Sequence, residues 1–301
     1  MTAKIIDGLE CSKKVLAGVG ERIAELRKSH PDFNAVLAIV QVGNRADSNV
    51  YINAKIQKAA NIGAKGTLVK LPDTATHDDL QRVINELNAD REVDGIIVQL
   101  PLDTKNEIDV DAIIDTINPQ KDVDGLTRFN AGLLMRGELS RAIIPCTPKG
   151  CLHLVQQATG DEKFTVGKHV VVLGRSKIVG SPAAALFMWN NSTVTICHSR
   201  TQNIEKYCRE ADILIVAIGK KHFVRGDWIK PGAVVIDCGI NVEEATEPGK
   251  KNKLFGDVHY DEAKEVAGYI TPVPGGVGPM TVAMLIKNTF EQAVRRRLES
   301  E

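Results

Sequence analysis

A strand, a glycine turn and the start of a helix follow one another between residues 169 and 182. The run His-Val-Val-Val-Leu from His169 breaks at Gly174, and a helix is expected to begin at Ser181-Pro182. In dinucleotide-binding folds this arrangement presents backbone N–H groups and a helix N-terminus to a pyrophosphate. Ser176 stands where the pattern G-x-G-x-x-G has its second glycine. Taken alone, the motif therefore fits equally well an ordinary turn in which glycine allows close packing.

The pattern that follows the loop favours the nucleotide interpretation. Four short apolar runs alternate with helical patterns; the runs lie at 170–173, 193–197, 213–218 and 233–237, and the helices near 182–189 and 204–210. Strands that alternate with helices form parallel sheets with right-handed crossovers. We therefore expect a Rossmann-type domain.

The end of the second strand in this series distinguishes two cofactors. An NAD site usually carries an acidic residue about 20 positions after the glycine loop, where it binds the ribose 2′-OH. Here the strand ends in His198, Ser199 and Arg200, and no acid is present. The pattern therefore favours NADP.

The first half of the chain predicts another α/β unit. Strands are expected at 35–42, 66–71 and 95–100. Helices are expected at 12–28, at 110–117, and between a cap at Asp47 or Ser48 and Gly63. A further helix is expected to follow a capping box at Thr76 and Asp79. A final helix at 280–298 is expected to return to this unit. We predict a catalytic domain at 1–148 plus 280–301 with a mainly parallel sheet, and a nucleotide domain at 149–279. Long helices would join the domains, with a cleft between them.

Composition excludes several classes of function. The 301 residues have a formal net charge of zero, and the basic trio Arg295–Arg297 is better explained as a solvated helix end than as a nucleic-acid surface. No apolar run reaches the length of a membrane span. Histidine and cysteine spacings match no metal site, so we expect no metal. The first residues resemble neither a signal nor a transit peptide, so a cytoplasmic location is expected.

Five polar residues are candidates for chemistry. Tyr51 and Lys55 are spaced to share one face of a helix, where an aromatic ring and an amine suit a flat heterocycle and proton transfer. A partly packed surface pair has the same spacing. Gln99 ends a strand, where α/β proteins place site residues, although a capping amide would also stand there. Asp122 and Asp124 lie in a loop that an acidic turn explains equally well.

The segment from Pro272 to Pro279 holds three glycines among three prolines before the last helix begins. Such a backbone is restricted in conformation and carries no bulky side chain, so a ligand can approach it closely. A rigid turn would rarely need so many constraints. We therefore favour a binding segment.

Together these segments resemble one family, the bifunctional methylenetetrahydrofolate dehydrogenase/methenyltetrahydrofolate cyclohydrolases. The matching runs follow the family's order along nearly the whole chain: 51–55, 98–102, 121–126, 145–148, 174–180, 237–241 and 271–281. The chain is most similar to the cytosolic NADP-dependent eukaryotic form, which in many organisms is the N-terminal part of a trifunctional protein.

The resemblance implies specific site residues. Lys55 would be the catalytic lysine, oriented by Gln99. Tyr51 would stack on the folate, and Asp124 would hold the pterin. The implied substrate-binding positions are Tyr51, Ile52, Asn53, Ala54, Lys55, Val98, Gln99, Leu100, Asp124, Pro274, Gly275, Gly276, Val277 and Gly278. The implied NADP contacts are Gly174, Arg175, Ser176, Ser199 and Ile240, with Arg175 and Ser199 at the 2′-phosphate and Arg200 adding charge.

The implied activity is oxidation of 5,10-methylenetetrahydrofolate with NADP, followed by hydrolysis of the methenyl product to 10-formyltetrahydrofolate. The implied assembly is a homodimer, with a formyltetrahydrofolate synthetase domain following in trifunctional forms. Two alternatives stay open: an NADP-dependent dehydrogenase of another small substrate, and a non-catalytic NADP-sensing module. Short-chain dehydrogenases also use Tyr-x-x-x-Lys, but after the glycine loop, whereas Tyr51 precedes Gly174 by 123 residues.

Overall fold

The structure, a computed structural model, describes residues 2–244 and 252–299, which form two compact units. The first unit takes its residues from 1–12 and 147–281, and the second from 13–146 and 282–301. Within the described ranges, no helix combines the length and the apolar character that crossing a membrane requires.

A six-stranded sheet in which all pairings are parallel forms the centre of the first unit. Its order is β1-β11-β8-β7-β5-β6, with β1 at Lys4–Ile5, β5 at His169–Leu173, β6 at Thr193–Cys197, β7 at Ile213–Val216, β8 at Val234–Asp237 and β11 at Tyr269–Ile270. Because β6 and β7 pair with opposite sides of β5, the strand order reverses there. In open α/β sheets, ligands bind at the carboxyl ends of the strands beside such a reversal.

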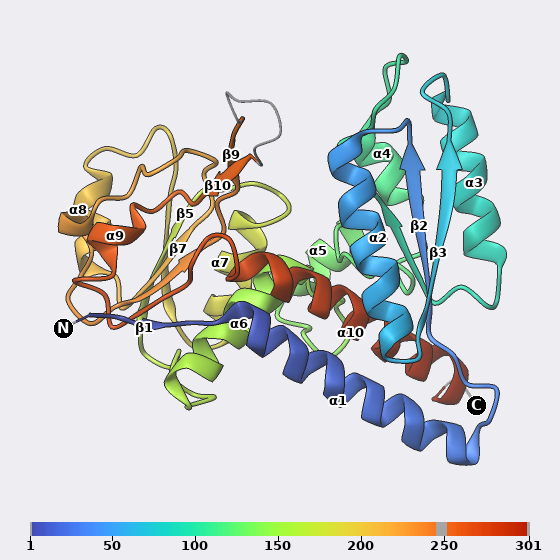
Figure 1. Cartoon of the computed structure of the whole chain (residues 1–301), viewed down its shortest axis with the longest axis horizontal. Coiled ribbons are helices and arrows are strands. Elements are labelled where there is room, and N and C mark those ends of the chain that lie inside the picture. The colour runs from blue at the N-terminus through green and yellow to red at the C-terminus, as the bar shows by residue number, and fades with distance from the viewer. Residues whose placement is uncertain (1, 245–251, 300–301) are drawn as a thin grey trace. The chain divides into compact units, whose positions relative to one another are not determined.

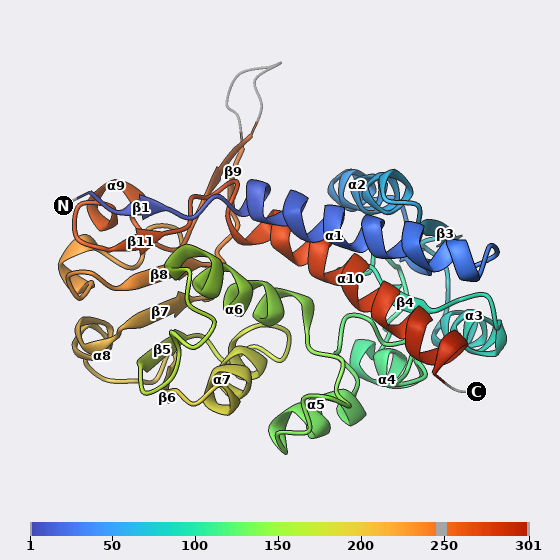
Figure 2. The same cartoon turned by 90° about the horizontal axis from the view of Figure 1, so that it is seen from below.

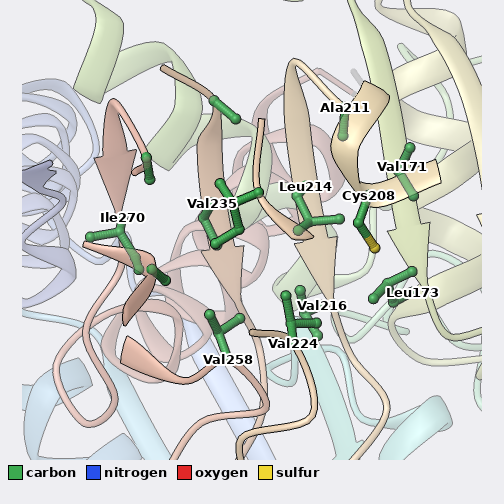
Figure 3. Close-up of a cluster of buried hydrophobic side chains, with 14 of the residues drawn as sticks. Val171, Leu173, Cys208, Ala211, Leu214, Val216, Val224, Val235, Val258 and Ile270 are labelled. Carbon is green, nitrogen blue, oxygen red and sulfur yellow. The ribbon is translucent and has the colours of Figure 1, made fainter. Parts of the chain in front are cut away.

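Helices cover both faces of this sheet. On one side lie α8 (Ile204–Glu210) and α9 (Tyr260–Ala263), and on the other α6 (Cys146–Thr159) and α7 (Gly180–Trp189), as Figures 1 and 2 show. Val171 and Leu173 of β5 pack with Leu214 and Val235 of neighbouring strands in a cluster that includes Cys208 of α8 (Figure 3). Alternate residues of each strand face opposite sides, which explains why nearly all positions of these strands are apolar.

The second unit contains a three-stranded parallel sheet in the order β3-β2-β4. The strands are β2 (Val36–Val42), β3 (Lys65–Leu71) and β4 (Gly95–Val98), and the helices are α2 (Ala46–Asn61), α3 (His77–Ala89), α4 (Val110–Asp115) and α5 (Arg128–Met135). One face packs on α3 and α4 through Leu80, Ile84 and Ile113. Figures 1 and 2 place α2 on the other face.

Two long helices run from one unit into the other. α1 spans Gly8–Ser29 and α10 spans Val277–Leu298. Within the second unit they pack on each other and on α2, with Leu16, Ala59 and Ile286 in one cluster and Ile23 and Phe290 in another. Residues 282–301, which include most of α10, belong to the second unit.

The contact-defined units differ from the predicted domain bounds at the N-terminus. Residues 1–12 belong to the first unit because β1 pairs with β11, Lys4 opposite Tyr269 and Ile5 opposite Ile270. A two-residue strand leaves no periodic signal, and its partner lies near the other end of the chain. The functional domain bounds stay a prediction.

Several short elements were not expected from the sequence. These are β1, β11, α5, α9, the 3₁₀ turn η1 (Gly226–Trp228), and the antiparallel pair β9 (Asn241–Glu243) and β10 (Lys253–Phe255). The expected capping box at Thr76 and Asp79 is confirmed. The expected cap of α2 at Asp47 or Ser48 is wrong: Arg45 is the N-cap residue, and the Asp47 carboxylate pairs with its guanidinium.

Candidate active site

Lys55 and Gln99 meet in the second unit, although 44 residues separate them. Lys55 lies on α2, and Gln99 directly follows β4. The Lys55 ammonium donates to Gln99 Oε1 at 2.9 Å, and Gln99 Nε2 donates to the Leu100 carbonyl at 2.8 Å. The second bond holds the amide so that its oxygen faces the lysine. Gln99 therefore has the geometry of an orienting residue.

Asp124 is coupled electrostatically to Lys55. Its side chain keeps partial exposure, yet the protein atoms around it exclude enough water to raise its pKa. The charge of Lys55 acts in the opposite direction, and so does a hydrogen bond with Cys146. A carboxylate, an amine and an amide are thus assembled around one region of the second unit.

The two aspartates of the loop at 121–125 have different roles. Asp122 is buried, and its carboxylate accepts from Leu126 N at 3.1 Å, Thr127 N at 2.8 Å and Asn130 Nδ2 at 2.9 Å. Asp122 is therefore structural. Lys121 is also buried and donates to three carbonyls at the end of α3, those of Leu87, Asn88 and Asp90.

The other predicted substrate-binding positions of this unit differ in exposure. Tyr51 is 47 % exposed, so its ring is available to a ligand, and Asn53 is also exposed. Ile52 and Val98 are buried in the core, and Ala54 and Leu100 are partly buried. The side chains of Ile52 and Val98 therefore serve packing.

The predicted segment Pro274–Gly278 lies in the first unit, whereas Tyr51, Lys55, Gln99 and Asp124 lie in the second. Gly275 has φ +108°, a conformation that favours glycine, and its carbonyl accepts from Leu9 N at 3.1 Å. A Cβ on Gly8 would lie 1.8 Å from the Gly276 carbonyl oxygen. The segment is therefore fixed by the N-terminal turn of α1.

The glycine loop after β5 is shaped by Gly174 and Gly180. Gly174 has φ +115°, and a Cβ there would lie 2.2 Å from the Ala217 carbonyl oxygen. A Cβ on Gly180 would lie 2.3 Å from the carbonyl oxygen of Gly174. Ser176 Oγ accepts from Val179 N at 3.2 Å and Gly180 N at 3.3 Å. Ser176 thus stabilises the turn, which explains the departure from the glycine fingerprint.

The predicted cofactor contacts follow the carboxyl ends of three parallel strands. Arg175 and Ser176 lie after β5, Ser199 after β6 and Ile240 after β8, and all four side chains are exposed. The loops after β5 and β7 flank the position where strand order reverses. This is the edge at which doubly wound sheets bind nucleotides.

Two buried aspartates at this edge were given no role in the sequence analysis, although Asp237 begins one of the matching runs. Asp237, at the end of β8, accepts from the backbone N–H groups of Gly239, Asp257 and Val258, and burial raises its pKa to about 6. Asp257 accepts from the backbone after β7. The only local signal was the run Gly256-Asp257-Val258 after an unrecognised strand.

Comparisons with known proteins agree with these two units. Residues 6–124 match the model of the tetrahydrofolate dehydrogenase/cyclohydrolase catalytic domain, and residues 145–297 match that of the NAD(P)-binding domain. The chain is 52 % identical over 293 residues to the human cytoplasmic C-1-tetrahydrofolate synthase, covering 97 % of this chain and 31 % of that protein. It thus spans about a third of the length of these curated synthases.

Full-length similarity is found with shorter relatives. The bifunctional protein FolD of Phenylobacterium zucineum is 47 % identical over 299 residues, which cover 98 % of both chains. A crystal structure of the Trypanosoma brucei methylenetetrahydrofolate dehydrogenase-cyclohydrolase, complexed with NADP and an inhibitor, matches with a TM-score of 0.90 and 39 % identity over 98 % of both chains. The chain therefore belongs to the tetrahydrofolate dehydrogenase/cyclohydrolase family of enzymes, as the resemblance of its motifs predicted.

Proposed function

We propose that this chain oxidises 5,10-methylenetetrahydrofolate to 5,10-methenyltetrahydrofolate with NADP and hydrolyses the product to 10-formyltetrahydrofolate. The observation that carries this proposal is the hydrogen bond from Lys55 to Gln99 beside Asp124, in a chain of this family. An NADP-sensing module would have no use for these three groups.

The first unit offers groups that fit NADP. The close contact of Gly174 with Ala217 brings backbone rather than side chains to the carboxyl ends of β5 and β7. The N-terminus of α7 follows this loop, where helix N–H groups favour a phosphate. Exposed Arg175 and Ser199 are suited to the 2′-phosphate, and no acid follows β6 to repel it. When bound, NADP accepts the hydride from the substrate.

Asp124 and Lys55 act on the charge that develops in the folate. Loss of hydride leaves a methenyl cation delocalised over N5 and N10. The Asp124 carboxylate favours this cation, whereas a protonated lysine would oppose it. We therefore assign the neutral amine of Lys55 to the reactive state, with one N–H directed to Gln99.

Hydrolysis begins when water adds to the methenyl carbon. Lys55 takes one proton from the added water, which leaves a neutral carbinol, and delivers that proton to N5 as the bond between that carbon and N5 breaks. The carbinol oxygen loses its remaining proton to solvent as the formyl C=O forms, so one proton is released overall. The formyl group then stays on N10. General acid–base assistance of this kind contributes about 10²- to 10⁴-fold to rates. Gln99 acts by orienting the amine rather than by transferring a proton.

The test replaces Lys55 by Met. K55M is expected to lose at least about 100-fold in the hydrolysis of methenyltetrahydrofolate, because it removes the proton-transferring amine. Lys58→Met is the matched control, since Lys58 lies one turn further along α2, and K58M should retain hydrolysis. Full cyclohydrolase activity in K55M would contradict the assigned role.

The same preparation distinguishes the alternatives. Wild-type protein is mixed with methylenetetrahydrofolate and either NADP or NAD, and the reduced cofactor is followed by absorbance. Turnover with NADP in preference to NAD is expected. NADP binding without turnover would favour a sensing module or another substrate.

The assembly and the cellular location of this chain are proposals that rest on its similarity to the family. The human relative is a cytoplasmic synthase by name. We place this chain in the cytoplasm, as a homodimer that acts on tetrahydrofolate derivatives, with a formyltetrahydrofolate synthetase portion in trifunctional forms. Sedimentation equilibrium of the purified chain tests the dimer.

A further inference from the structure

Three consecutive backbone N–H groups after β7 donate to one carboxylate, that of Asp257. The nitrogens of Ile218 and Gly219 lie 2.7 and 2.9 Å from Oδ2, and the nitrogen of Lys220 lies 2.8 Å from Oδ1. Asp257 has no exposed surface. Its carboxylate is therefore committed to the conformation of this loop.

The same carboxylate also reaches the segment after β8. Asn241 Nδ2 donates to Asp257 Oδ1 at 2.9 Å. The backbone N–H of Asp257 donates to Asp237 Oδ1 at 3.0 Å, and Asp237 Oδ1 also accepts from Gly239 N at 2.8 Å. A Cβ on Gly239 would lie 2.4 Å from the Asp257 nitrogen, so these segments are in direct contact.

A third connection leads to the glycine loop. Ala217, which precedes the segment held by Asp257, donates its N–H to the Leu173 carbonyl at 2.8 Å, and its own carbonyl lies against Gly174. Asp257 thus holds the loop after β7, which in turn packs on the loop after β5. The loops after β5, β7 and β8 become one hydrogen-bonded assembly at the reversal of strand order.

We propose that Asp257 is a positioning residue for NADP, because it fixes the loops after β7 and β8 in the conformation that receives the dinucleotide. This inference rests on the proposed function. The Asp257 side chain is saturated with hydrogen bonds from the protein, so it acts through these loops and not by contact with the cofactor. Because these loops are already ordered in the free protein, the binding of NADP does not lose free energy by ordering them.

The test replaces Asp257 by Asn. The amide has one acceptor oxygen in place of two and turns an NH₂ group toward backbone N–H donors, so part of the loop loses its partner. D257N is expected to raise the Kd for NADP and the KM for NADP at least about ten-fold, with a smaller change in kcat. Hydrolysis of methenyltetrahydrofolate, which consumes no NADP, should stay near the wild-type rate.

Asp212→Asn is the matched control. Asp212 precedes β7 at the opposite edge of the same sheet, where it accepts from His169 N at 2.9 Å and from the Lys230 ammonium at 2.6 Å. D212N is expected to lower stability and to leave the Kd for NADP unchanged. An equal rise in the Kd for NADP in D212N and D257N would mean that Asp257 only stabilises the fold in general, and it would overturn the proposal.

A milder variant covers the case in which D257N does not fold. Asn241→Ala removes one donor to Asp257, and its Kd for NADP should rise about three-fold or more. An unchanged Kd in folded D257N, or in N241A if D257N is unfolded, overturns the inference. Calorimetric titration of the wild type with NADP separates this failure from failure of the proposed function, which would show as no binding at all.

Discussion

At the scale of single residues, position in the fold gives neighbouring aspartates different chemistry. Asp122 and Asp124 are two positions apart, yet one is a buried acceptor of three hydrogen bonds and the other interacts with Lys55. Spacing cannot separate these roles, because Asp122 depends on how its own loop folds, and Asp124 depends on a lysine that is distant in the chain. Asp257 also depends on distant groups, since its backbone donors lie 37 to 39 residues away.

The raised pKa of Asp237 predicts that the free energy of unfolding depends on pH. Burial raises its pKa to about 6, whereas the unfolded chain releases this proton near the ordinary value of 3.8. Between pH 4 and 6 the folded state therefore holds more protons, so this group's contribution to the free energy of unfolding falls as pH rises. The fall amounts to about 2–3 kcal/mol.

The measurement is urea unfolding of the wild type and Asp237→Asn from pH 4 to 7. The substituted amide does not titrate, so the stability lost in D237N should shrink as pH rises through this window. Other carboxyl groups with raised pKa values, such as Asp124, titrate in both proteins and cancel in the difference. A difference that stays constant, or grows with pH, would refute the assignment.

At the scale of elements, strands with continuous apolar runs were predictable and short elements were not. The expected strands 35–42 and 213–218 correspond to β2 at Val36–Val42 and β7 at Ile213–Val216, because burial on both faces demands apolar side chains at almost every position. By contrast, β1 and β11 have two residues each and form only because parallel partners are present.

A buried residue of the helix α10 leads to the prediction that a packing contact of this helix affects the active site. Buried Asn288 donates through Nδ2 to the carbonyls of Val123 at 2.9 Å and Ile144 at 3.0 Å. Asn288→Leu keeps the number and branching of the side-chain heavy atoms but leaves both carbonyls without this donor, at a cost of about 2–4 kcal/mol. Because Val123 adjoins Asp124, cyclohydrolase activity should fall as well.

Chemical denaturation and the cyclohydrolase assay check this prediction. Lys287→Ala, one position earlier on α10, removes a partly exposed ion pair with Glu291 and should cost about 1 kcal/mol or less. If N288L were as stable and active as K287A, the carbonyl contacts would have no energetic role.

At the scale of the whole molecule, tryptophan fluorescence can follow the unfolding of one of the two units. Both tryptophans, Trp189 and Trp228, belong to the first unit, so tryptophan fluorescence follows its unfolding. NADP at about 100 times its Kd should raise the free energy of the fluorescence-detected transition by about 2.7 kcal/mol. NAD at the same concentration should raise it less, because Arg175 and Ser199 would have no 2′-phosphate to bind.

Urea titrations that follow fluorescence, with and without each nucleotide, provide the measurement. Ser199→Asp supplies the counterpart, since an acid after β6 favours the ribose 2′-OH of NAD and repels a phosphate. S199D should be stabilised more by NAD than by NADP. Equal stabilisation of the wild type by both nucleotides would contradict the proposed cofactor preference.

By itself, the sequence determined the two parallel-sheet units, their main strands and helices, and the family, because hydrophobic periodicity and short motifs are local properties. The tertiary structure alone decided that Asp122 is structural and that β1 joins the first unit. It also decided that Asp257 connects the loops after β7 and β8. The pairing of β1 with β11 and the contacts of Asp257 depend on hydrogen bonds between residues far apart in the chain, whereas those of Asp122 depend on how its own loop folds. Such bonds form only where folding brings a buried donor and acceptor together, and periodicity contains no record of that pairing.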